Sequence, residues 1–503
     1  MKISYRELKD KILGCWWGKT AGGTIGAPFE CYRGCRDLDF YVQDDPSGVP
    51  NDDLDLQLMV LRAVEKYGNR IDAHILAEYW LTYVSTSMAE YGAGKNNLRH
   101  QLPPPLSGSF NNVNRNSCGA FIRSEMWACL CPGNPDLAVR YAMEDAMIDH
   151  GEEGVYGEVF CAAVESQAFV ESDIRKLLEK GLGFIPEDSG MARGVRCVID
   201  AYDSGLTWKE ARKVVLKTVP GSFGMLCGTY PGEAPEPDIP PAEHGYDAPS
   251  NVALGVLGLL YGEKDFGRTL CLSAGCMEDA DCTAGFAAAA LGIILGHENL
   301  PKKWIDPLGH KIVTWCLRID SDLFVPQTVE ELSARVLRLI PAFLGEEIVH
   351  YGAEGFEVEI VSAYTLFRHP GMRQIGEGDF PKVLARVPDT VRYRGVPFDT
   401  YVQYENGPTA AANSRKKLKF CFYNNMREQQ SLEMKWHVPE GVTISPASCW
   451  VSLDQAHGGY PVAEREVVLE FGELSSAKLD LSVEVITNGR YTKTFIPIVL
   501  LVE

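Results

Sequence analysis

The sequence predicts a multidomain protein with an all-α helical domain over residues 1–350 and a C-terminal antiparallel β-sandwich over residues 355–503. Helix-start signals and apolar residues at helical period recur up to about residue 350. Beyond about residue 355, apolar and polar residues alternate with period two, as in half-buried strands. A chain of 503 residues is long enough for roughly two to four domains.

Helix-start signals punctuate the first part of the chain. Capping boxes, in which Ser or Thr is followed three residues later by Glu, begin at Ser4, Thr207 and Thr328. The run after Asp53 keeps leucines and a valine on one helical face and ends at Gly68. Further helices are expected over 73–84, 134–147, 156–170, 189–203, 250–261 and 283–296. The last is rich in Ala and Gly, which lets helices approach closely, so we expect it in the middle of the bundle.

Two long loops interrupt the helices, over about 99–117 and 219–248. Structureless loops of this length inside a compact domain are usually functional or disordered. Each precedes a segment that we expect at the active site.

The C-terminal part shows strand patterns joined by turn signals. Two of these strands lie on either side of Asn488-Gly489, which favours a hairpin turn. Alternating apolar residues in the strand region include Val467, Leu469, Phe471, Leu479, Leu481, Val483 and Val485. In this region we find no pair of acids and no cluster of aromatic residues that would indicate a binding or catalytic site. We therefore expect the region to serve packing, homo-oligomerisation or partial cover of the pocket.

Composition excludes several classes of partner. A formal charge of −20 argues against nucleic acid or an anionic membrane surface. The longest strongly apolar stretch, 287–295, is too short to span a bilayer. The N-terminus shows no export signal, and fifteen cysteines at irregular spacing favour reduced thiols. We therefore expect a cytoplasmic protein.

Two acidic clusters lie far apart in the sequence, each where a loop gives way to a predicted helix. One spans residues 51–55 and the other residues 278–282. Asp and Asn are favoured helix N-caps, so a single acidic start can be a cap alone. Each cluster has more acids than capping requires, and such carboxylates repel one another unless a cation offsets them. If the fold joins the clusters, about four carboxylates would form a site for hard divalent cations.

Four segments resemble, in order, the motifs of the ADP-ribosylglycohydrolase family, which includes dinitrogenase-reductase-activating glycohydrolase and the ADP-ribosyl-acceptor hydrolases. Residues 14–30 resemble the opening helix and its loop glutamate, and Asn51-Asp52-Asp53 resembles the first metal motif. Residues 116–120 and 149–157 resemble the substrate-contacting stretch. Asp279-Ala280-Asp281-Cys282 resembles the second metal motif.

The resemblance implies an all-α fold and a binuclear Mg²⁺ centre, with Mn²⁺ as a substitute. It also implies hydrolysis at the anomeric carbon of an ADP-ribosyl or related ribosyl substrate, through an oxocarbenium-like transition state that carboxylates stabilise. The metal ligands expected from it are Asn51, Asp52, Asp53, Asp279, Asp281 and Cys282. The catalytic residues are Asp53 or Asp281, positioning water, and Glu30, acting on water or on the leaving group; a surface-loop acid is the alternative for Glu30.

The same resemblance assigns a set of substrate-binding residues. His150 matches a residue that contacts the ADP-ribose part, with a structural histidine as the alternative. Backbone amides of Ser117 and Gly119 could bind a phosphate, although a tight helix start explains both almost as well. Tyr246 and Asp247 precede another predicted helix, and from that position we expect them to line the same pocket. With these two, the full set is Ser117, Cys118, Gly119, His150, Gly154, Tyr156, Tyr246 and Asp247.

Departures from the family pattern keep other functions open. Asn51 and Cys282 stand where the family has hydroxyl ligands, and a thiol suits Mg²⁺ poorly. The family's opening loop often has Asp where this chain has Gly23. The alternatives are an N-riboside (nucleoside-like) hydrolase without a diphosphate pocket, and a non-catalytic, crystallin-like binding or structural protein.

Overall fold

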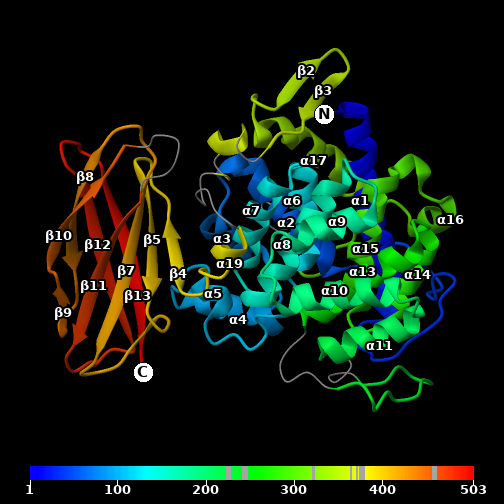
Figure 1. Cartoon of the computed structure of the whole chain (residues 1–503), viewed down its shortest axis with the longest axis horizontal. Coiled ribbons are helices and arrows are strands. Elements are labelled where there is room, and N and C mark those ends of the chain that lie inside the picture. Colours follow the sequence, from blue (N-terminus) through cyan, green and yellow to red (C-terminus); the bar gives the residue numbers. More distant parts are fainter. Residues whose placement is uncertain are drawn as a thin grey trace.

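A helical body and a C-terminal pair of β-sheets stand side by side in the computed structural model (Figure 1). The structure describes residues 1–222, 228–240, 247–319, 323–362, 365–369, 372, 380–455 and 462–503. The predicted fold class is confirmed. Among the described residues, each helix is too short or too polar to cross a bilayer.

Within the described residues most helices lie before residue 345, and a 3₁₀-helix and a short α-helix follow later. The α-helices are α1 (Tyr5–Gly26), α2 (Asp52–Tyr67), α3 (Ala73–Tyr83), α4 (Ala89–Arg99), α5 (Leu106–Ser109), α6 (Ser124–Leu130), α7 (Pro135–Ala146), α8 (Glu152–Ala168), α9 (Ile174–Leu182), α10 (Gly190–Asp203), α11 (Trp208–Thr218), α13 (Ala248–Gly262), α14 (Phe266–Gly275), α15 (Ala280–Leu295), α16 (Lys302–Ile305), α17 (Val329–Leu344) and α19 (Phe380–Leu384). The 3₁₀-helices are η1 (Ala27–Phe29), η2 (Gly68–Arg70), η3 (Phe121–Arg123), η4 (His297–Asn299), η5 (Asp306–Leu308) and η6 (Thr365–Arg368).

The helix starts and helices predicted from local sequence signals agree with the helix bounds in the structure. Thr207 and Glu210 form both bonds of a capping box, while the Ser4 and Thr328 side chains accept from the backbone of the third helical residue. Each of the six further helices expected from apolar period is present, with ends within a few residues of the prediction. The capping hydrogen bonds satisfy amide groups that a helix start leaves without partners.

A glycine repeat fixes the closest helix pair of the body. Glycines at every fourth position of α1, from 14 to 26, face the Ala/Gly stripe of α15. A Cβ atom at Gly18 would lie 2.1 Å from the Ala288 carbonyl oxygen, and one at Gly22 would lie 2.3 Å from that of Ala284. Since Gly14 meets Gly292 and Gly26 meets Asp281, the helices run antiparallel. The expectation that α15 runs centrally is confirmed.

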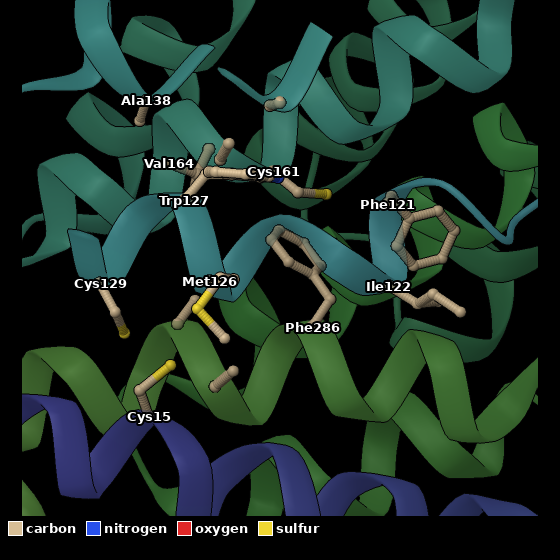
Figure 2. Close-up of a cluster of buried hydrophobic side chains, with 14 of the residues drawn as sticks. Cys15, Phe121, Ile122, Met126, Trp127, Cys129, Ala138, Cys161, Val164 and Phe286 are labelled. Carbon is tan, nitrogen blue, oxygen red and sulfur yellow. The ribbon is translucent and has the colours of Figure 1, made fainter. Parts of the chain in front are cut away.

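Large apolar side chains close the core above this pair. Figure 2 shows Trp127 and Met126 of α6 over Phe286 of α15, with Cys15 of α1 below. These side chains are fully buried. Burying a large side chain of this kind contributes about 1.5–3 kcal/mol, so the core holds α1, α6 and α15 at one fixed spacing.

The C-terminal strands form two five-stranded sheets. The strands are β4 (Thr390–Tyr393), β5 (Phe398–Tyr404), β6 (Thr409–Ala410), β7 (Arg415–Asn424), β8 (Gln430–His437), β9 (Val442–Ser445), β10 (Ser448–Leu453), β11 (Val462–Phe471), β12 (Lys478–Thr487) and β13 (Lys493–Val502). Their orders are β4-β5-β7-β11-β9 and β10-β8-β12-β13-β6, antiparallel except for β13 with β6. The alternating apolar residues of both sheets share one buried core. The hairpin expected at Asn488-Gly489 joins β12 to β13.

A small sheet bears on where the helical domain ends and the C-terminal domain begins. It has the order β1-β3-β2 and joins β1 (Lys2–Ser4) to β2 (Val349–Gly352) and β3 (Gly355–Glu359). Leu366, Phe380 and Leu384 also belong to the core of the helical body. The division at 350 and 355 stays a prediction; these contacts lead us to propose that the helical unit continues to about residue 388.

The two parts meet through polar and apolar contacts. Arg392 of β4 pairs with Glu144 of α7 at 3.0 Å and with Asp399 of its own sheet at 2.9 Å. Leu102 and Leu106, from the segment expected as a loop, are buried in the core of the two sheets. The segment before Ser117 therefore docks the sheets as well as leading towards the candidate site.

Candidate active site

The antiparallel pair α1–α15 brings the Glu30 loop to the second acidic segment. The C-terminal end of α1 lies beside the start of α15, and Glu30 follows directly after η1. The backbone of Cys31 donates to the Glu278 carbonyl at 2.9 Å, and Glu278 donates to the Tyr32 carbonyl at 2.8 Å. This short ladder holds the Glu30 loop against the residues that precede α15.

Candidate metal-ligating atoms gather in two overlapping groups. The first, here called the inner group, is Asp53, Asp281 and Cys282; the second, the outer group, is Glu30, Asp279 and Asp281. Within each group the ligand atoms lie within 4.8 Å of one another. The Oδ1 atoms of Asp279 and Asp281 are buried and have no hydrogen-bond partner. Buried carboxylate oxygens without partners are costly, and a divalent cation would satisfy them.

The carboxylates of these groups destabilise one another's charged forms. Burial, and then the charge of Asp53, raises the pKa of Asp279 to about 7. Loss of hydration, and then the charges of Asp279, Asp52 and Asp53, raises the pKa of Glu30 to about 8. For Asp281, burial and then Glu30 raise the pKa well above its usual value. A bound cation would remove this penalty, so the three carboxylates of the outer group fit a hard divalent ion.

Asn51 and Asp52 have local partners as well. The Asn51 side-chain oxygen caps α2 by accepting from the Asp53 amide at 2.7 Å, and its Nδ2 lies 3.3 Å from Asp281 Oδ2. Asp52 accepts from the Tyr91 hydroxyl at 2.9 Å. Burial and the neighbouring Asp53 charge raise the pKa of Asp52 to about 6. Their assignment as ligands stays a prediction.

Besides Asp52, two acids of the sequence clusters lie outside both groups. Asp55 is buried and accepts from the amides of Trp315 and Cys316 at 2.8 and 2.9 Å. Glu278 pairs with Arg33 at 2.7 Å and lies 3.6 Å from Arg212. Both therefore support the loops around the site.

Lys19 is a site residue that sequence motifs did not indicate. Its ammonium is 2% exposed and lies 3.3 Å from Asp53 Oδ2 and 2.9 Å from Glu125 Oε1. Burial alone would lower the pKa of Lys19, but the charges of Glu125 and Asp53 outweigh burial and raise it. A single lysine within a small and apolar helical run was the signal that could have indicated this buried charge.

The predicted substrate stretch is built as a buried hydrogen-bond network. The Ser117 hydroxyl and His150 Nε2 lie 3.0 Å apart, and His150 Nδ1 lies 2.9 Å from Asp149, which Arg123 contacts at 3.0 Å. Ser117 and His150 are fully buried. A Cβ at Gly154 would lie 2.7 Å from the His150 ring. These features fit the structural alternatives for Ser117 and His150.

The other predicted substrate-binding residues lie in different surroundings. Gly119 packs against Glu90, since a Cβ there would lie 2.3 Å from its carboxylate. Cys118 is buried, and burial followed by the charge of Asp279 raises the pKa of its thiol. Tyr156 is half-buried and lines a depression with His150 and Leu384.

Asp247 and Tyr246 precede α13. Asp247 occupies the N-cap position of α13, and burial followed by the charge of Glu153 raises its pKa to about 7. Tyr246 lies outside the described residues. From the same helix, Asn251 Oδ1 accepts from the Asp279 amide at 3.1 Å. Asn251 therefore positions one acid of the outer group.

Comparison with known families assigns the helical body. The model of the ADP-ribosylglycohydrolase family matches residues 4–340, which is more than half of the chain. The protein is therefore a glycohydrolase-family protein by fold and sequence pattern. It belongs to the ADP-ribosylglycohydrolase family.

Solved structures show weaker likenesses. An ADP-ribosylglycohydrolase-related protein complex is 18% identical, with 67% of this chain and 99% of that chain covered and a TM-score of 0.45. A FixG-related protein from Vibrio parahaemolyticus is 9% identical, with 21% and 97% covered and a TM-score of 0.18. The GAE domain of GGA2p from Saccharomyces cerevisiae is 16% identical, with 23% and 97% covered and a TM-score of 0.15. No curated protein matches the sequence.

Proposed function

We propose that this protein is a metal-dependent hydrolase that cleaves the glycosidic bond at the anomeric carbon of an ADP-ribosyl or related ribosyl substrate. Family membership supports hydrolysis of this general kind. The two acidic groups offer up to two positions for Mg²⁺ or Mn²⁺. Buried cysteines such as Cys118, Cys276 and Cys282 are free thiols, which is consistent with a reducing, cytoplasmic setting.

One observation carries the proposal. The inner and outer groups converge from chain segments more than two hundred positions apart, and three of their buried carboxylate oxygens, Asp53 Oδ2, Asp279 Oδ1 and Asp281 Oδ1, have no hydrogen-bond partner. Helix capping does not require this, because α2 is already capped by Asn51. A bound divalent ion would orient ribose hydroxyls and lower the pKa of a water.

The residues of the site would then have separate roles. Asp279 and Asp281 hold cations and place negative charge beside the carbon at which positive charge develops. Glu30 is the solvent-accessible member of the outer group, so it is placed to meet the substrate. From that position Glu30 is the candidate to act on water or on the leaving group.

A second candidate is hydrolysis of a riboside that lacks a diphosphate. The amides of Ser117, Gly151 and Gly154 each donate to a backbone carbonyl, at 3.0, 3.0 and 3.1 Å. Amides that are engaged in this way are not free for a phosphate. This observation favours a nucleoside-like substrate over ADP-ribose at that stretch.

A hydrolysis panel separates the candidates. ADP-ribosyl-arginine, ADP-ribosyl-serine, O-acetyl-ADP-ribose and plain nucleosides would be incubated with the protein, with Mg²⁺ or with a chelator. Asp53→Asn and Asp281→Asn should each lower kcat/KM by about 100-fold or more, since losing even a supporting contact of a metal ligand costs about 10–100-fold.

The matched control lies in the same helical turn. Asp55→Asn removes charge next to the site but not from either group, so it should keep metal-dependent hydrolysis and lower only thermal stability. Activity that is unchanged in Asp53→Asn and Asp281→Asn would refute the site. Binding of Mn²⁺ without hydrolysis of any compound would favour the non-catalytic alternative.

A further inference from the structure

We propose that the Lys19 ammonium takes the place of one of two cations, so that this chain holds one divalent ion tightly, in the outer group. This inference rests on the proposed function. It assigns a role to a buried charge that hydrolysis itself does not require, and it predicts the metal content of the protein.

The two groups differ in the charge that surrounds them. Among the described residues, Glu30, Asp279 and Asp281 form no ion pair with a lysine or arginine. In the inner group, Asp53 lies 3.3 Å from Lys19. The outer group thus has three carboxylates and no protein cation, whereas the inner aspartate already has one.

The Lys19 ammonium is held in place on several sides. Beyond Asp53, it contacts Glu125 at 2.9 Å and donates to the Ile122 carbonyl at 3.1 Å. Glu125 in turn accepts from Gln57 at 2.8 Å. Lys19 lies between Gly18 and Gly22, where α1 touches the backbone of α15. The ammonium cannot leave the inner group without breaking these contacts.

Most of the other metal-ligating atoms of the inner group also have hydrogen-bond or ion-pair partners within the protein. The Cys282 thiol donates to Asp53 Oδ1 at 3.3 Å, while Asp53 Oδ2 faces Lys19. A thiol is a poor ligand for Mg²⁺. Of the inner carboxylate oxygens, Asp53 Oδ2 and Asp281 Oδ1 are without a hydrogen-bond partner; the first faces the Lys19 ammonium, and the outer group shares the second residue. A second divalent ion would meet the ammonium's repulsion and few free oxygens.

Metal stoichiometry tests the inference. Mn²⁺ would be titrated into the full-length protein by calorimetry, and bound Mn²⁺ would be examined by electron paramagnetic resonance. The wild type should bind one ion tightly and show no Mn–Mn coupling. Asp279→Asn should weaken that ion at least tenfold.

The decisive variant removes the buried pair together. Lys19→Met with Glu125→Gln keeps the charge balance and the side-chain size, and it should add a second Mn²⁺ with spin coupling. Lys11→Met is the control from the same helix, because Lys11 reaches Ile293 O at the other end of α15. The Lys11→Met variant should still bind one Mn²⁺ ion, as the wild type does.

The outcomes distinguish this inference from the proposed function. Two spin-coupled ions of similar affinity in the wild type overturn the inference, and hydrolysis that persists with them leaves the function standing. A folded double variant that still binds one ion also overturns it. A wild type that binds no Mn²⁺ overturns both. If the double variant does not fold, the wild-type stoichiometry decides alone.

Discussion

At the scale of single residues, the site contains several carboxylates close together, and other groups of the protein neutralise only part of their negative charge. Lys19 neutralises Asp53, and Asn51 donates to Asp281, but the outer group has no protein cation among the described residues. Burial and mutual repulsion therefore raise the pKa of Asp279 to about 7 and of Glu30 to about 8. The repulsion between these carboxylates therefore destabilises the folded protein when no metal ion is bound.

We expect the metal-free protein to lose stability as pH rises from about 4 to about 8. In this window the folded protein retains protons on Asp52, Asp279 and Glu30 that the unfolded chain releases, so the free energy of unfolding falls with increasing pH. Thermal unfolding in chelator across this range measures the slope. Saturating Mg²⁺ should flatten it; an equal slope with and without Mg²⁺ would contradict the assignment of these acids to a metal site.

At the scale of elements, the glycine repeat of α1 sets the distance between the acids. Because α1 touches the backbone of α15, the Glu30 loop reaches the start of α15. A wider spacing would separate Glu30 from Asp279. Lys19 of α1 lies 3.3 Å from Asp53, which α2 contributes, so three helices together position the ligands and the buried cation.

Gly22→Ala should destabilise the protein by about 1–3 kcal/mol, the usual cost of forcing extra volume into a packed core. Its Cβ would lie 2.3 Å from the Ala284 carbonyl oxygen. Urea denaturation measures the change, and Mn²⁺ affinity should fall with it. Gly352→Ala is the control, because a Cβ there meets nothing within 4 Å. Equal stability of the two variants would rule out the close helix contact.

At the scale of the whole molecule, β4 carries the polar link between the helical body and the sheets. Arg392 lies between Glu144 and Asp399, and its backbone carbonyl contacts the His74 ring nitrogen at 2.8 Å. The buried leucines at 102 and 106 add an apolar contact from the helical side. The sheets are thus packed onto the body, as expected from sequence; their part in oligomerisation or pocket cover stays a prediction.

Arg392→Met should lower the free energy of unfolding by about 3–5 kcal/mol, because it leaves buried carboxylates without their partner. The side chains of Arg392 and Glu144 are 13% and 7% exposed. The control is Arg415→Met, which breaks an exposed pair with Glu470 and should cost about 0–1 kcal/mol. Denaturant unfolding followed by tryptophan fluorescence compares the two. Similar losses in both variants would mean that the interface pair adds nothing.

Sequence patterns located most of the fold because the signals are local. Helix caps such as Thr207, the period-two strands and the turn at Asn488-Gly489 each act over a few neighbouring residues. The boundary between the parts depends on longer-range contacts, such as the pairing of β3 with β1, so the division at 350 and 355 stays a prediction. The acidic motifs likewise indicated candidate ligands but not which acids serve the loops, as Asp55 and Glu278 do.

The sequence by itself determined that the chain has a helical part with two acidic helix starts and a strand-rich part, because apolar period and capping depend on adjacent residues. Only the tertiary structure decided which carboxylates face one another, that Lys19 stands against Asp53, and that Ser117 and His150 are enclosed. The physical reason is that burial and charge pairing arise between segments far apart in the chain, and here they depend on how closely α1 packs against α15.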